Sequence, residues 1–221
     1  PVNYSVGVSP VSICAVDFVG DALLDMAVAN ETSSTITILS NNGDGSFGLG
    51  GSISVATGPL QVIAADFNRD ARSDLAAGTK FGAISVVLNE PTPHASDYAV
   101  GSTWVLLSAG RMDGDANLDL AVLSVSDENI SVLAGDGNGN FVPTIVYGVG
   151  GISILAADLN RDGADDIAAA RLGRVSILLN SRSCCIGGTG NIDCDPADGV
   201  DISDLSVLID NLYITFTPLC C

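Results

Sequence analysis

A nine-residue acidic segment that recurs four times is the feature of this sequence that most constrains its fold. The clearest copy runs from Asp158 to Asp166 and places side-chain oxygens at its first, third, fifth and ninth positions. Ca2+ takes six to eight oxygen ligands, and a tight loop with an acid or amide at alternate residues directs them inward. An Asp- and Gly-rich hairpin turn is the alternative interpretation of one isolated copy. Because the segment is repeated, we expect Ca2+ ligands at Asp158, Asn160, Asp162 and Asp166.

The other copies begin at residues 17, 66 and 111, so the four start 45 to 49 residues apart. Repeats of that length are typical of propellers and solenoids. Val19 removes one oxygen from the first copy, and Arg111 replaces the first acid of the third, where its guanidinium is a candidate substitute for the metal. We therefore expect the second and fourth loops to bind Ca2+ most tightly and the third least. The expected ligands are Asp17, Asp21 and Asp25; Asp66, Asn68, Asp70 and Asp74; and Asp113, Asp115 and Asp119.

The charged residues exclude some classes of partner. The formal net charge of -18 comes almost wholly from aspartate, and the basic residues are Lys80 and seven arginines. Such a chain has no basic surface for nucleic acid or for an anionic membrane. Its apolar runs are far shorter than the roughly 18 residues of a membrane-spanning helix, so we expect no membrane span.

Several features favour an extracellular location. The chain begins at Pro1, as it would after removal of a signal peptide or after trimming. Six cysteines, five of them near the C-terminus, suggest an oxidising compartment. Asn3, Asn30 and Asn129 begin glycosylation sequons. We expect a secreted protein.

Short apolar runs with turn residues between them predict strands throughout the repeats. Two turns, at 41–47 and 136–141, are rich in Asn, Asp and Gly, and Glu90–His94 is a proline-stiffened insertion. The runs form four units of four strands, namely 4–8, 11–18, 24–29 and 35–39; 53–56, 61–67, 75–78 and 83–88; 98–101, 103–108, 120–124 and 130–133; and 145–149, 152–159, 167–170 and 175–179.

The pattern Asp-Phe-Asn-x-Asp-x-x-x-Asp-Leu-Ala, followed by a strand, a Gly-Asp-Gly-x-Phe turn and another strand, resembles the FG-GAP/VCBS repeats of integrin-like β-propellers. The resemblance covers residues 1–182. It implies an all-β fold, a four-repeat β-propeller of four-stranded blades, in which the acidic loop between the first two strands of each blade binds Ca2+. Four repeats are fewer than propellers of this family usually have.

The strand order suggests how the ring closes. If each acidic loop lies between the first two strands of a blade, the last blade ends at Leu179 with three strands, and Tyr4–Val8 is a leading strand without a blade. One completes the other, and the pairing covers sheet edges that would otherwise be exposed. Within one chain this closes a ring, whereas between chains it makes a homo-oligomer or filament. The sequence does not choose between them.

Residues 183–221 have a different composition and form a second predicted domain. Their acids lead into an apolar stripe at helical spacing, which resembles one dockerin-type Ca2+ loop and helix. An extra residue near Pro196 and the lack of a second repeat depart from that pattern, and an Asp-capped helix is the alternative. The expected ligands are Asp193, Asp195, Asp198, Asp201 and Asp204.

The cysteines of this second domain suggest that it is disulfide-rich. Cys184 and Cys185 before the loop and Cys220 and Cys221 after it are candidate staples, which leaves Cys194 unpaired or bridging to another chain. Cys14 lies in an apolar strand instead and is expected to be a buried free thiol.

The sequence offers little for catalysis, so we expect no enzyme. His94 is the only histidine, and a Ser-His-Asp arrangement is possible only there. The leading hypothesis is a secreted Ca2+-binding structural or adhesive module that self-assembles through strand exchange. The alternatives are a carbohydrate-binding propeller, which predicts exposed aromatic residues, and an accessory domain of a larger extracellular enzyme. Trp104 is expected in a strand, in the core or in packing between blades, rather than in a sugar platform. Glycans and extracellular proteins are the further candidate partners.

Overall fold

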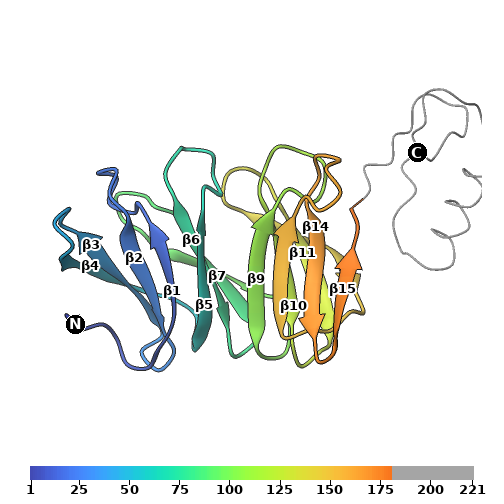
Figure 1. The fold of residues 1–221 in the computed structure, drawn as a ribbon, viewed down its shortest axis with the longest axis horizontal. Coiled ribbons are helices and arrows are strands. Elements are labelled where there is room, and N and C mark those ends of the chain that lie inside the picture. Colours follow the sequence, from blue (N-terminus) through green and yellow to red (C-terminus); the bar gives the residue numbers. More distant parts are fainter. Residues whose placement is uncertain (181–221) are drawn as a thin grey trace, which may run out of the picture. The chain divides into compact units, whose positions relative to one another are not determined.

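The computed structural model describes residues 1–180, which form antiparallel sheets of consecutive strands (Figure 1). Three sheets have four strands and the last has three. The first sheet contains β1 (Pro10–Val16), β2 (Asp25–Asn30), β3 (Thr35–Asn41) and β4 (Phe47–Ser54). The second contains β5 (Pro59–Ala65), β6 (Asp74–Thr79), β7 (Ala83–Val87) and β8 (Ala95–Ala99). The third contains β9 (Val105–Gly110), β10 (Asp119–Ser124), β11 (Asn129–Gly135) and β12 (Phe141–Tyr147). The fourth contains β13 (Ser153–Ala157), β14 (Asp166–Arg171) and β15 (Arg174–Leu178).

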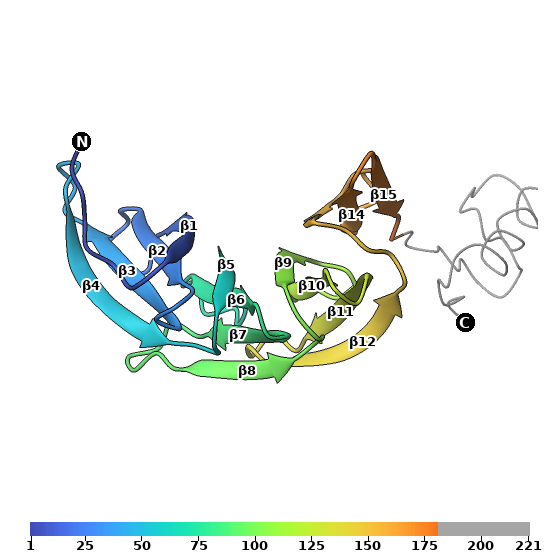
Figure 2. The ribbon, with the colours of Figure 1, turned by 90° about the horizontal axis from the view of Figure 1, so that it is seen from below.

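The sheets stack face to face in chain order within the compact unit Pro1–Leu179. The first strands of successive sheets contact one another, β1 with β5, β5 with β9 and β9 with β13. Strands β4, β8 and β12 lie on the opposite, outer side (Figure 2). This is a propeller-like arrangement of four repeats, in which each acidic loop joins the first strand of a sheet to the second.

An apolar cluster fills each of the three spaces between sheets. The first contains Ile36 and Leu75, and the second contains Phe67 and Leu120. The third contains Leu123 and Ile167. All six side chains are less than 5% exposed. Because alternate residues of a strand face opposite sides of its sheet, the second and third sheets contribute to two clusters each.

The structure confirms the order of the strands and the position of every acidic loop, but it overturns the expected strand at Tyr4–Val8. The Tyr4 ring packs edge to face on Phe47, with ring centroids 5.7 Å apart, and Val8 N–H donates to Ser33 Oγ at 2.6 Å. This segment therefore lies against the first sheet as irregular chain and does not pair with the last sheet. Its β-favouring residues do not pair with any strand in this structure.

The expectation of four strands in every unit is wrong for the last sheet among the described residues, where β13, β14 and β15 have no fourth partner. The alternative expectation, a last blade of three strands, is confirmed. The outer strands β4 and β12 begin earlier than expected, at Phe47 and Phe141, because their exposed residues lack a clear apolar alternation.

The structure also bears on the expectations for Cys14 and for a membrane span. Cys14 is free and partly buried against the first cluster, and burial raises the pKa of its thiol to about 11. The part of the chain that the structure describes contains no helix long and apolar enough to cross a membrane. The dockerin-like ligands from Asp193 to Asp204, and the other five cysteines, lie outside the described residues.

Close approach of the second and third sheets should make Gly78 in β6 sensitive to substitution. A Cβ added there would lie 2.3 Å from Val105 O, which is backbone and cannot move aside easily. We expect Gly78→Ala to lower the free energy of unfolding by about 1–3 kcal/mol through overpacking, as measured by urea denaturation. Gly48→Ala in β4 is the matched control, since its nearest atom would be 3.8 Å away. Equal stability of the two variants would contradict the described contact.

Candidate functional site: the acidic loops

The four acidic loops follow the first strands of their sheets, and hydrogen bonds join the third loop to the second and to the fourth. Arg69 Nη1 of the second loop donates to Asn117 Oδ1 of the third at 3.2 Å. Arg111 N–H of the third loop donates to Asp165 Oδ2 of the fourth at 2.7 Å. The repeats therefore bring their acids together at one end of the stacked sheets.

The ninth-position acid is buried in every loop and accepts backbone N–H groups. In the second repeat, Asp74 Oδ2 accepts from Phe67 N–H at 2.9 Å and Asp74 Oδ1 accepts from Asn89 N–H at 2.7 Å. These donors follow the first strand and the third strand of the sheet, so one carboxylate ties both chain segments to the second strand. The same pair of bonds forms at Asp25 with Phe18 and Asn41, and at Asp119 with Met112 and Gly135.

Asp166 accepts the equivalent first bond from Leu159 N–H at 3.0 Å. All four of these acids are 0% exposed. Burial raises the pKa of Asp74 and of Asp119 above the usual aspartate value, while the backbone N–H donors act in the opposite direction. The ninth acid thus has a structural role that does not require a metal ion, in addition to its predicted role as a ligand.

The first-position acid folds back onto its own loop. Both oxygens of Asp158 accept backbone N–H groups, from Arg161 at 2.6 Å and from Gly163 at 3.0 Å. Asp17 and Asp66 do the same in their loops. Left-handed backbone at the fourth position, with φ of 67° at Arg161, makes this turn possible. These backbone hydrogen bonds help to hold the loop closed.

The side chains at the third and fifth positions also form hydrogen bonds or ion pairs within their loops. Asn68 Oδ1 accepts from Asp70 N–H at 3.1 Å, and Asn160 Oδ1 accepts from Asp162 N–H at 3.0 Å. In the second loop, Arg72 lies 2.6 Å from Asp70 Oδ2, and its hydrogen bonds lower the pKa of that carboxyl. In the first loop, Asp21 Oδ1 accepts from Leu23 N–H at 2.9 Å.

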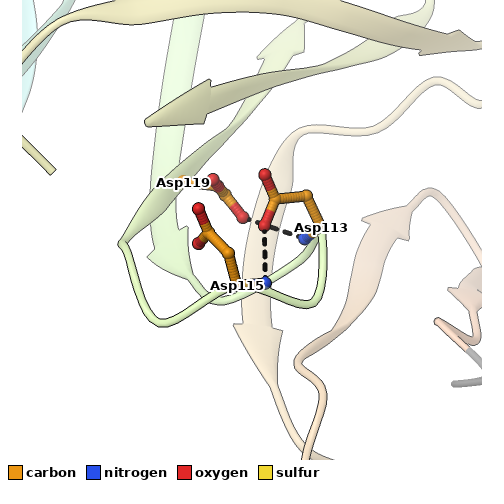
Figure 3. Close-up of side chains that lie close together, drawn as sticks. All are labelled: Asp113, Asp115 and Asp119. Atoms are coloured by element: carbon orange, nitrogen blue, oxygen red, sulfur yellow. Dashed lines mark hydrogen bonds between the residues drawn. The ribbon is translucent and has the colours of Figure 1, made fainter. Parts of the chain in front are cut away.

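Among the described residues, acids converge as a possible metal cluster in the third loop. One oxygen of each of Asp113, Asp115 and Asp119 lies within 4.8 Å of the others (Figure 3). Asp113 and Asp115 are exposed, and Asp119 is buried below them. This loop lacks the first acid that draws the other loops closed, so its remaining carboxylates lie near one another.

Arg111 does not take the place of a metal in this structure. Three ion pairs form within residues 1–180, between Arg72 and Asp70, Lys80 and Glu31, and Arg171 and Glu128, and none involves Arg111. Its backbone instead bonds with Asp165 of the next loop. The third loop still has an arginine in place of the first acid, and the ranking of the loops by calcium affinity stays a prediction.

Sequence reasoning did not single out Asn89. Its Nδ2 donates to Phe18 O at 2.8 Å and links the second sheet to the first loop, while its N–H donates to Asp74. Asn41 stands at the equivalent place in the first repeat and donates to Leu24 O. An asparagine close to the end of the third strand in both repeats was the available signal.

His94, Trp104 and Asn30 were considered for catalysis, sugar binding and glycosylation, and the structure shows the surroundings of each. His94 lines an open groove of about 480 Å³ between the first two sheets, with Ser52 and Ser54; its described lining holds no carboxylate that could orient the imidazole. Trp104 is 52% exposed just before β9, so the expectation that it packs in the core is wrong. The sequon residue Asn30 is fully buried, which leaves no room for a glycan there.

A family model described as FG-GAP-like repeat matches residues 9–77 and 111–169. A search of curated proteins gives no match. Among solved structures, one of BBS1N in complex with ARL6DN, soaked with mercury, superposes with a TM-score of 0.54 at 12% identity, covering 75% of this chain and 49% of that chain. A second, soaked with lead, gives 0.52 at 16% identity, covering 78% and 58%. The chain thus spans about half the length of the solved structures that it matches, and the likeness concerns the fold.

The structural role of the ninth acid can be tested in the absence of metal. Asp74→Asn keeps the shape but leaves one amide NH2 facing a backbone N–H. We expect it to lower the free energy of unfolding in EDTA by about 1–3 kcal/mol, the cost of an unsatisfied buried donor. Asp70→Asn is the matched control in the same loop, with an expected change within about 0.5 kcal/mol because its ion pair is at the surface. Similar losses in both variants would refute this role.

Proposed function

This chain belongs to the family of FG-GAP-like repeat proteins, and we propose from that premise that it is a secreted, Ca2+-binding interaction module without a catalytic role. The repeats supply a rigid stack of sheets, and the acidic loops supply the binding chemistry at one end of it. The excess of aspartate, with a net charge of -18, suits a metal-rich extracellular setting. The six cysteines support the same location.

The observation that carries the calcium proposal is the cluster of Asp113, Asp115 and Asp119. Its donors are all carboxylate oxygens, which are the hard ligands that Ca2+ prefers over softer nitrogen or sulfur. Close carboxylates also repel one another, and a bound cation removes that repulsion. These three residues would hold the ion, which would stiffen the exposed part of the loop. In the other loops, the same types of ligand are available once a cation competes with the backbone N–H groups.

The interaction proposal rests on the fold. Two solved structures with a similar fold are complexes of BBS1N with another protein, ARL6DN. Stacked sheets of this kind present a large surface made from loops and sheet edges, and loops on a rigid scaffold commonly carry binding residues. We therefore propose that extracellular proteins bind this chain, and that bound Ca2+ sets the shape of the loops they contact.

Calcium binding should be measurable by isothermal titration of the EDTA-treated chain. We expect heat on Ca2+ addition and a higher melting temperature, since a ligand at a hundredfold excess over its Kd adds about 2.7 kcal/mol of stability. Asp115→Asn should weaken Ca2+ binding at the third-loop site at least tenfold, because it removes one of the three converging carboxylates.

Asp162→Asn in the fourth loop is the matched comparison. A larger loss in Asp162→Asn than in Asp115→Asn would show that the ranking from ligand count, with loops two and four tightest, is correct and that the cluster is not the main site. Absence of heat together with superimposable melts in Ca2+ and EDTA would overturn the calcium proposal.

Glycan binding is a second candidate function, and the exposed Trp104 favours it. Its backbone is left-handed, with φ of 55°, a conformation that costs a residue with a Cβ about 1–2 kcal/mol. Strain of this kind concentrates at functional sites. Trp104 N–H donates to Lys80 O at 3.1 Å, which places it beside the hairpin that carries Phe81, itself 61% exposed. Ser102 bonds to Asp127 and braces the same loop.

A glycan array followed by titration would test this candidate. We expect Trp104→Ala to weaken binding of any glycan hit at least tenfold, because stacking on the indole is lost, whereas Trp104→Phe should retain part of the affinity. The control is Phe47→Ala, which alters an aromatic residue on the first sheet. Lack of any hit, or equal affinity of wild type and Trp104→Ala, would dismiss the candidate.

A further inference from the structure

Within residues 1–180, no sheet packs on the outer, apolar face of the last sheet. Leu155 of β13, Ala168 of β14 and Ile177 of β15 lie directly opposite one another across the strands. Leu155 is 54% exposed and Ile177 is 48% exposed. Ser153, Ala170 and Val175 form the adjacent row on the same side. We call these six residues the last-sheet face, and an exposed apolar surface of this kind indicates a binding site.

The same row occurs in each of the other three sheets, where another sheet covers it. The registers place an alanine of the second strand between a residue of the first strand and one of the third, and each of these rows packs against the sheet that follows in the chain. The rows are Cys14, Ala27 and Ile38; Ile63, Ala76 and Val86; and Ser108, Ala121 and Val132. The last-sheet face is therefore a fourth copy of a surface that binds a sheet of this protein three times.

The complementary surface occurs at the other end of the chain. Val62 of β5 and Leu107 of β9 are the residues that meet the preceding sheet, and they are 3% and 1% exposed. The equivalent residue of the first sheet is Ile13, which lies opposite Val28 in the register and is 58% exposed. We call Ile13, Val28 and their neighbour Ala15 the first-sheet face. It has no preceding sheet, and Figure 2 shows it at the far end of the row from β14 and β15.

A polar contact joins the first strands of successive sheets; between the third and fourth sheets it lies two residues further along both strands, where Ser108 Oγ accepts from Ala156 N–H at 2.8 Å. Ser12 Oγ accepts from Val62 N–H at 3.2 Å, and Gln61 Oε1 accepts from Leu107 N–H at 2.7 Å. Repeat spacing makes Ser153 the equivalent acceptor on the last sheet. The equivalent donor on the first sheet is Ile13 N–H. The two end faces thus match in apolar shape and in this hydrogen-bond pair.

We propose that the last-sheet face of one copy binds the first-sheet face of a second copy, so that the stack of sheets continues from chain to chain. This deepens the proposed interaction function by naming a partner, but it does not depend on bound Ca2+. The contact is heterologous, since two different patches meet, and such contacts produce closed rings or open filaments. It differs from strand exchange because no strand leaves its sheet.

The segment 1–8 competes with the second copy. It crosses part of the first-sheet side, where a Cβ on Gly7 would lie 2.6 Å from Asn30 Cγ, and Val28 is only 6% exposed. Ile13 at the inner strand stays uncovered. Docking of a second copy requires this segment to move, so removal of residues 1–8 should strengthen association rather than abolish it.

Sedimentation velocity of the full chain over a concentration series tests the proposal. We expect reversible association in both Ca2+ and EDTA, and a chain without residues 1–8 should associate at least tenfold more tightly. Val175→Asp should weaken association at least tenfold by placing a charge in the interface. Val142→Asp on β12 is the matched control, because Val142 and Val175 are 62% and 63% exposed and only Val175 belongs to the last-sheet face.

Mixing two variants distinguishes this contact between different faces from a symmetric contact between identical faces. Ile13→Asp disables the first-sheet face and Val175→Asp disables the last-sheet face, so each variant alone should be monomeric. Together they should form a one-to-one dimer that grows no further, since one intact pair of faces remains. Ile177→Asp is a second variant of the last-sheet face, and circular dichroism checks that each variant is folded.

The inference is overturned if the full chain and the chain lacking residues 1–8 both remain monomeric at the highest concentration. It is also overturned if folded Ile13→Asp and Val175→Asp fail to associate when mixed. Association that persists without any calcium binding would leave this inference standing while the calcium proposal fails, so the two can be told apart.

Discussion

A single buried carboxylate at the end of each acidic loop is the interaction on which the rest of each repeat depends. At Asp25, Asp74 and Asp119 it accepts one N–H from the residue after the first strand and another from the end of the third strand. The second strand begins at this acid, so three strands are fixed at one point. Within a loop anchored in this way, the first-position acid closes the turn through its own backbone hydrogen bonds, as at Asp158.

Small residues in the second strand of each sheet are the second recurring feature, and they allow the repeats to pack together. Alanine at its centre lets neighbouring sheets approach closely, and longer side chains such as Leu75, Leu120 and Ile167 fill the space beside it. Gly78 against Val105 shows how little room remains. Because every sheet carries the same two surfaces, each end sheet of the described stack has one uncovered apolar face. Self-association and ring closure are two ways to bury these faces.

The recurring spacing of the acids predicted the acidic loops, and the apolar runs between turn residues predicted the strand order. It could not separate the two roles of aspartate, because an acid that accepts backbone N–H groups and one that binds a cation use the same positions. The loss of the first acid at Arg111 looked unfavourable for metal binding. In the structure the first acid bonds to the backbone of its own loop, as at Asp158, and in the third loop, which lacks this acid, Asp113, Asp115 and Asp119 converge. Tyr4–Val8 and Trp104 were misplaced because a local pattern does not show which surfaces a neighbouring sheet leaves available.

Amide hydrogen exchange of the folded chain, with and without EDTA, tests most directly whether the buried acids organise the repeats independently of metal. The N–H groups of Asn41, Asn89 and Gly135 donate to these acids across each sheet. The account predicts strong protection of all three in both conditions, with calcium changing exchange only in the exposed parts of the loops. Loss of their protection on chelation would show that the metal, and not the carboxylate, holds each repeat together.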